Sequence, residues 1–75
     1  MPDVLLDTRG LKCPLPVLRA RKAMQGVAAG EVLRVLATDP GTVRDFEAFC
    51  EATGHELVTH SQDEGEFTFR IRKAG

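Results

Sequence analysis

The chain has 75 residues, of which 43% are hydrophobic and 28% are charged, and its formal net charge at pH 7 is −1. This composition is typical of one small globular domain spanning residues 1–75 and excludes an intrinsically disordered chain. A domain of this size buries only a thin core, which excludes a deep substrate cavity.

The chain begins with a strand and a helix. Residues 4–6 begin the strand, and a turn signal at residues 8–10 closes it. Pro14 and Pro16 then open a helix that we expect to run to about Val27, because proline fits a first helical turn but not later ones. The expected buried face of this helix comprises Val17, Ala20, Met24 and Val27.

A second strand and a second helix follow. Residues 31–38 are apolar enough to form a strand in the middle of a sheet. We expect the helix from about Thr42 to Thr53, where Thr42 and Asp45 have the spacing of a capping box and Gly54 ends the helix. The expected buried face of this helix comprises Val43, Phe46, Phe49 and Cys50.

Two further strands complete the chain. Residues 57–60 form the third strand and residues 67–72 the fourth, with a tight turn at residues 63–65 between them. Apolar and polar residues alternate in the last strand, so one of its faces is expected to be buried. The order of elements predicts an α/β (α+β) fold, a two-layer sandwich with both helices on one face of a small mixed four-stranded sheet. The order of the strands within the sheet is left open.

Cys13 carries the clearest chemical signal in the chain. If Pro14 is the first helical residue, Cys13 is the N-cap, where unpaired N–H groups and the helix dipole favour an anion. Pro14 and Pro16 have no N–H, so only Leu15 can donate to the sulfur within the first three helical positions. The sequence therefore predicts an exposed thiol with a lowered pKa, rather than a cysteine that serves only as a small buried side chain.

Basic residues gather near this cysteine. The first 30 residues contain five basic and two acidic residues, whereas the remainder contains five basic and nine acidic residues. Arg9 and Lys12 would both favour a thiolate. With Lys12, the helix residues Arg19 and Lys22 form either a solvated face or a docking surface for an acidic partner. A nucleic-acid domain would usually be more basic and carry aromatic residues among its charges, which argues against direct nucleic-acid binding.

The other reactive side chains are assigned to the core or the surface. Cys50 lies one turn after Phe46 on an apolar face, so we expect an inert core thiol. Asp45 could cap the second helix or belong to a functional site, and its spacing from Thr42 favours the cap. His55 and His60 match no metal-ligand spacing and are expected at the surface or a strand edge, so no metal site is predicted. The chain thus has a nucleophile without an evident general base, which indicates transfer chemistry completed by a partner.

Cys13 stands in the run Asp7-x-x-Gly10-x-x-Cys13-Pro14-x-Pro16. The further matching residues are Ala20, Lys22, Thr38, Asp39, Pro40, Asp45, Phe49, Cys50, Gly54 and His55. This pattern resembles the TusA/SirA-like sulfur-carrier family over nearly the whole chain. The resemblance implies a βαβαββ sandwich in which Cys13 takes sulfane sulfur as a persulfide. The tRNA-thiolation members usually carry glutamate between the two prolines, where this chain has Leu15, a departure that concerns the pathway and not the chemistry.

The resemblance also implies a function and partners. The protein would be a sulfurtransferase-type carrier rather than a stand-alone enzyme, and the resemblance supplies no cofactor. The sulfur donor would be a cysteine desulfurase or a rhodanese-like protein, and the acceptor another relay protein of tRNA thiolation, molybdenum cofactor synthesis or sulfur oxidation. No apolar run is long enough to span a bilayer and the first residues lack the features of a signal peptide, so we expect a cytoplasmic protein without a membrane partner.

Two alternatives stay open. The first is a regulatory module that binds protein or nucleic acid through its basic first helix, with an incidental thiol. The second is a redox sensor, which would need a resolving thiol near Cys13.

Overall fold

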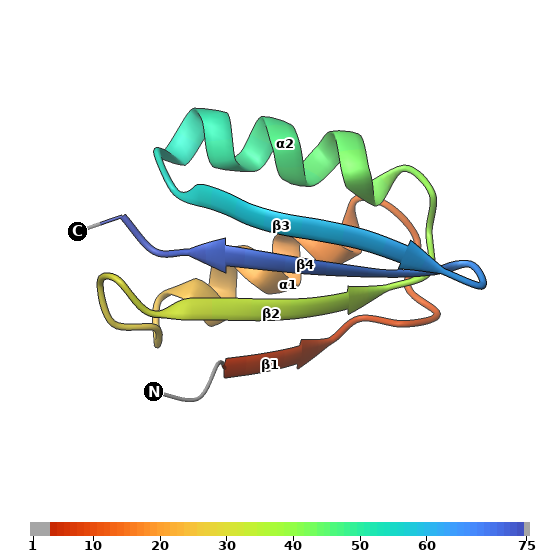
Figure 1. The fold of residues 1–75 in the computed structure, drawn as a ribbon, viewed down its shortest axis with the longest axis horizontal. Coiled ribbons are helices and arrows are strands. Elements are labelled where there is room, and N and C mark those ends of the chain that lie inside the picture. Colours follow the sequence, from red (N-terminus) through yellow and green to blue (C-terminus); the bar gives the residue numbers. More distant parts are fainter. Residues whose placement is uncertain (1–3, 75) are drawn as a thin grey trace.

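The computed structural model describes residues 4–74 and forms a mixed four-stranded sheet with two helices on one face (Figure 1). In chain order the elements are β1 (Val4–Asp7), α1 (Leu15–Met24), β2 (Val32–Ala37), α2 (Thr42–Thr53), β3 (Glu56–Asp63) and β4 (Glu66–Arg72). The strand order is β1-β2-β4-β3, and only the β1–β2 pair is parallel among these strands. The predicted two-layer sandwich and the central place of the second strand are confirmed.

The parallel pair positions two loops beside each other. A parallel pair needs a crossover connection, which α1 provides between β1 and β2. Leu6 lies opposite Val35, and Asp7 lies opposite Leu36. Because both strands end at the same edge of the sheet, the loops that follow them meet there, at the right-hand end of Figure 1.

The core lies between the helices and the covered face of the sheet. Its buried apolar residues are Ala20, Met24, Val27, Leu33, Val35, Ala37, Phe46, Phe49, Cys50, Phe67, Phe69 and Ile71. At its centre the rings of Phe46 and Phe69 lie 4.6 Å apart between centroids. The predicted helix faces are confirmed, with Val17 and Val43 half-buried at the margin of the core.

Two element boundaries differ from expectation. α1 ends at Met24 rather than near Val27, although Val27 stays buried and its N–H donates to the Met24 carbonyl at 3.1 Å. β3 is longer than expected, because its polar second half pairs with β4 as far as the turn at Glu64 and Gly65. α2 has the expected bounds, and Gly54 ends it with a left-handed φ of +81°. Within residues 4–74, neither helix has the length and apolar character needed to cross a membrane.

Candidate functional site

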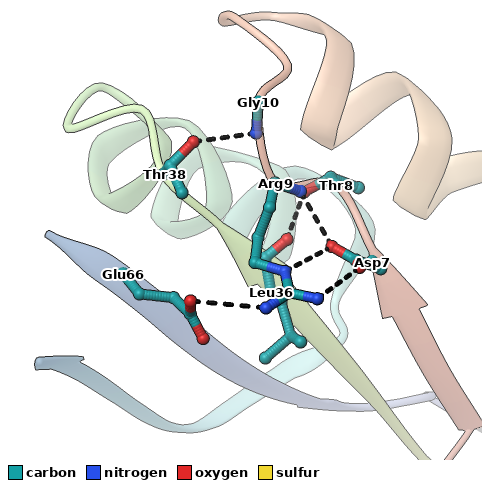
Figure 2. A network of polar contacts seen from close by, with 7 residues as sticks. All are labelled: Asp7, Thr8, Arg9, Gly10, Leu36, Thr38 and Glu66. Carbon is teal, nitrogen blue, oxygen red and sulfur yellow. Dashed lines mark hydrogen bonds and ion pairs between the residues drawn. The ribbon is translucent and has the colours of Figure 1, made fainter.

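The loop from β1 to Cys13 is fixed to β2. Thr8 is buried, and its N–H and hydroxyl donate to the Leu36 carbonyl at 2.8 and 2.5 Å. The N–H of Gly10, a residue with φ +83°, donates to the Thr38 hydroxyl at 2.9 Å. Figure 2 shows both contacts, which hold the predicted turn against the neighbouring strand. The position of Cys13 is therefore set by β2 as well as by β1.

Arg9 is engaged by two acids on the sheet. Its Nε and Nη2 donate to the two carboxylate oxygens of Asp7 at 2.9 and 2.8 Å, and its Nη1 lies 3.5 Å from Glu66 Oε2 (Figure 2). The hydrogen bonds from Arg9 lower the pKa of Asp7 to about 2, and the same contacts raise the pKa of Arg9. The structure thus places this guanidinium on Asp7 and Glu66, and not on the thiol that we expected it to stabilise.

Cys13 lies one residue outside the N-cap of α1. The helix begins at Leu15, its N-cap is Pro14, and the Cys13–Pro14 peptide bond is cis. The Leu15 N–H donates to the Lys12 carbonyl at 2.9 Å. This N–H closes a four-residue turn before the helix and is not available to the sulfur. The predicted N-cap position of Cys13 and its hydrogen bond from Leu15 are therefore wrong.

Two carboxylates, one from the β2–α2 loop and one from α2, hold Cys13 instead. Asp39 accepts the N–H groups of Cys13 and Gly41 at 2.7 and 2.8 Å. The thiol of Cys13 donates to a carboxylate oxygen of Asp45. This hydrogen bond, partial desolvation and the charges of Asp45 and Asp39 raise the pKa of Cys13 to about 11. The thiol is exposed, as predicted, but it is neutral at pH 7, and the predicted lowering of its pKa is wrong.

Asp45 belongs to the site rather than to a capping box. The N-cap of α2 is Gly41, and no side chain caps this helix. The Thr42 hydroxyl donates to the Asp39 carbonyl at 2.6 Å, while Asp45 in the first helical turn accepts the Cys13 thiol. The predicted capping box is therefore wrong. The site interpretation of Asp45, which the spacing made the less favoured of the two, agrees with this contact, and the family pattern that includes Asp45 is a signal that could have pointed to it.

A shallow groove between the two helices borders this contact. Its volume is about 280 Å³, and its lining residues are Pro14, Val17, Arg21, Asp45, Ala48 and Phe49. Most of this lining is apolar, and Arg21 is a basic residue that sequence reasoning had not singled out. Leu15 and Leu18 of α1 are 43% and 51% exposed. Exposed apolar side chains on this helix are suited to contact with another protein.

The remaining predicted basic residues are all exposed. Arg19 and Lys22 lie on the outer side of α1. Lys12 lies close enough to Asp39 to help the N–H groups of Cys13 and Gly41 lower the pKa of that carboxyl. Of the two motif prolines, Pro16 is a buried residue in the first turn of α1 and Pro14 is exposed. The structure thus brings Lys12 to the site, whereas Arg19 and Lys22 are exposed on α1 without a contact to it among residues 4–74.

The second cysteine and the histidines lie elsewhere. Cys50 is only 6% exposed within the core, and burial raises its pKa, so its predicted place in the core is confirmed. His55 is half-buried, and its Nδ1 accepts the Ala74 N–H at 2.9 Å, whereas His60 is exposed. Among residues 4–74 no group of three His, Cys, Asp or Glu side chains is placed to hold a metal ion.

Comparisons with known proteins agree with this architecture. The family model described as sulfurtransferase TusA matches residues 4–73. The sulfur carrier protein TusA of Allochromatium vinosum is 50% identical over 72 residues, covering 96% of this chain and 95% of that protein. A putative sulfur carrier protein of Neisseria meningitidis serogroup A is 55% identical, with coverages of 96% and 97%. The crystal structure of a SirA-like protein from Desulfitobacterium hafniense superposes with a TM-score of 0.82 at 27% identity, covering 96% of this chain and 99% of the other.

Proposed function

The chain belongs to the sulfurtransferase TusA family and is a sulfur carrier, and we propose that it carries sulfane sulfur as a persulfide on Cys13 and passes it to an acceptor protein. The two sulfur carriers compared above span nearly the same length as this chain, so the likeness concerns the whole domain and not a fragment of it.

An exposed free cysteine on a fixed turn is the observation that carries this proposal. The Cys13 N–H is bound by Asp39, the turn is closed by the Leu15 N–H, and the preceding loop is held to β2 through Thr8. A sulfur presented on such a rigid turn can enter the active site of another protein without the entropy cost of ordering a flexible loop. Transfer between proteins therefore suits this site better than turnover of a small molecule bound within the domain.

Loading is a thiol–persulfide exchange that needs no external oxidant. Cys13 loses its proton, and its thiolate attacks the outer sulfur of the donor persulfide to form a new S–S bond. The S–S bond of the donor breaks, and its electron pair stays on the donor cysteine, which can take up the released proton. Delivery to the acceptor repeats this exchange with Cys13 as the leaving thiolate.

The proposed partners are proteins. A cysteine desulfurase or a rhodanese-like protein would supply the sulfur, and a relay protein of tRNA thiolation, molybdenum cofactor synthesis or sulfur oxidation would accept it. Leu15 and Leu18 offer exposed apolar contacts to such partners, and Lys12, Arg19 and Lys22 offer positive charge to an acidic surface. We place the protein in the cytoplasm, because loading requires a reduced thiol and that compartment keeps thiols reduced.

Intact mass after incubation with a cysteine desulfurase and cysteine tests this function. The expected result is a gain of one sulfur atom that a reductant removes. Cys13→Ser should abolish the gain, and Cys50→Ser, which alters the buried thiol, should retain it. No gain with any competent donor would contradict the proposal. The regulatory alternative makes the opposite prediction, since Cys13→Ser would then leave function intact and charge reversal at Arg19 and Lys22 would abolish it.

A further inference from the structure

Two carboxylates act on the Cys13 sulfur, and two basic side chains lie near those carboxylates. Asp45 on the first turn of α2 accepts the thiol, and Asp39 in the β2–α2 loop binds the N–H of the same residue. Lys12, in the turn before α1, acts on Asp39, and Arg21 of α1 lines the groove that Asp45 also lines. The one side chain that the structure shows bonded to the sulfur, within residues 4–74, is thus a carboxylate.

We propose that Asp45 is a positioning residue that distinguishes the empty carrier from the loaded one, a role that rests on the proposed persulfide function. Asp45 holds the sulfur of the empty carrier as a thiol against α2, and it cannot hold the persulfide in the same way. The groove beside this contact marks the side of the molecule from which a partner would approach.

The chemistry of the two states explains the difference. In the empty carrier Sγ has a proton to donate, and the hydrogen bond to Asp45 stabilises that proton on sulfur. In the persulfide Sγ is bonded to a second sulfur instead of hydrogen, so the donor of this hydrogen bond no longer exists. A persulfide is also a stronger acid than a thiol, and an anionic outer sulfur is repelled by Asp45 and Asp39. The loaded sulfur therefore leaves Asp45 and faces the partner.

This arrangement would protect the empty carrier. The thiolate is the form of cysteine that attacks electrophiles and is oxidised, so a residue that keeps Cys13 protonated suppresses both side reactions. The protection would disappear on loading, when the sulfur has to be available for transfer.

Asp45→Asn is the variant that tests the proposal, because it keeps the shape of the side chain and removes its charge. If the pKa of Cys13 falls from about 11 toward its ordinary value of 9.0, the thiolate fraction near neutral pH rises by up to about 100-fold, the limit reached only if the desolvation and the charge of Asp39 that remain contribute little. The intrinsic nucleophilicity of a thiolate falls with its pKa, which offsets about tenfold of this gain. Alkylation of the empty carrier by iodoacetamide at about pH 7.5 should therefore be faster in the variant, by up to about tenfold.

The measurement is the rate of iodoacetamide labelling at Cys13 across the pH range in the full chain, with peptide mass spectrometry separating Cys13 from Cys50. Asp45→Ala serves as a second variant, with the same expected direction. Glu47→Gln is the matched control, since it removes one negative charge from an exposed position of the same helix and should leave the titration midpoint unchanged. An unchanged midpoint in folded Asp45→Asn and Asp45→Ala would overturn the proposal.

A second arm uses the loaded carrier, prepared with inorganic polysulfide and verified by intact mass. Its persulfide should gain much less reactivity with iodoacetamide from Asp45→Asn than the thiol does, because Sγ of the persulfide has no hydrogen to donate to Asp45 and only the weaker charge repulsion is removed. If Asp45→Asn raised the labelling rate of the persulfide as much as that of the thiol, Asp45 would only limit access of the reagent. That result would overturn the proposal. Failure of a desulfurase to load Cys13 would instead contradict the carrier function, and it would not alter the titration midpoint of the thiol.

Discussion

At the scale of single residues, negative charge decides the chemical state of Cys13. The hydrogen bond to Asp45, partial desolvation and the charges of Asp45 and Asp39 together raise the pKa of Cys13 from 9.0 to about 11. Because the folded state favours the neutral thiol, this shift contributes stability that is fully present below about pH 9 and is lost as the pH rises through about 11. Under the proposed function, a partner that loads Cys13 would have to remove the thiol proton against the negative charge of these two carboxylates.

Arg9 provides a test of this account at the same scale. Arg9→Gln should leave the titration midpoint of Cys13 unchanged, because Arg9 pairs with Asp7 and Glu66. The same variant should raise the pKa of Asp7 from about 2 toward its ordinary 3.8. Asp7 contributes stability above about pH 4 that is lost as the pH falls toward 2, so the variant should lose less stability over that range than the wild type.

NMR titration of the Asp7 carboxyl and urea unfolding at several acidic pH values check the prediction for Arg9. Arg70→Gln on β4 is the control, because it also removes a positive charge from the sheet. The pKa of Asp7 is measured in this variant in the same way. A lower titration midpoint of Cys13 in Arg9→Gln would contradict the structure. A higher midpoint would show that Arg9 stabilises the thiolate, as the sequence predicted.

At the scale of the elements, the sequence was most informative where the signals are local. The limits of α2 follow from its apolar face and from Gly54, whose left-handed backbone ends the helix. The alternation in β4 predicted which side chains of that strand are buried. The extra length of β3 could not be predicted, because its polar second half becomes a strand only through pairing with β4.

The immediate surroundings of Cys13 could not be predicted for a related reason. The two charged residues nearest to Cys13 in the sequence, Lys12 and Arg9, are basic, while the carboxylates that contact it lie 26 and 32 positions further along the chain. They reach the sulfur because β1 and β2 are neighbouring parallel strands, and the sequence left the strand order open. An expectation based on neighbours in the sequence therefore had the sign of the pKa shift reversed.

The β3–β4 turn gives a prediction at the scale of the elements. Its two residues, Glu64 and Gly65, have φ values of +51° and +78°, which are unfavourable for glutamate and typical of a hairpin turn that prefers Asn-Gly. Glu64→Asn should raise the free energy of unfolding by about 0.5 kcal/mol, measured by urea denaturation. Glu64→Gln removes the same charge without the preference for positive φ, so an equal gain in that control would assign the effect to charge and contradict the conformational explanation.

At the scale of the whole molecule, the two cysteines report on different regions. Cys13 is exposed at the edge of the sandwich, whereas Cys50 belongs to the same core cluster as Phe46 and Phe49. A reagent reaches Cys13 in the native state, but it reaches Cys50 only when the core opens. A domain of this size has a free energy of unfolding of roughly 4–11 kcal/mol, so a single change in the core alters the population of open molecules many-fold.

Phe46→Leu uses this difference. Phe46 is fully buried against Phe69, and its shortening should lower the free energy of unfolding by about 1.5 kcal/mol. Since about 1.4 kcal/mol corresponds to a factor of ten in the open population, labelling of Cys50 should become about tenfold faster. Labelling of Cys13 should stay within about twofold of the wild type, because its rate depends on native contacts with Asp45 and Asp39. If the labelling rate of Cys13 also rose tenfold, the site would open together with the core. The contact with Asp45 would then not control the reactivity of the native thiol.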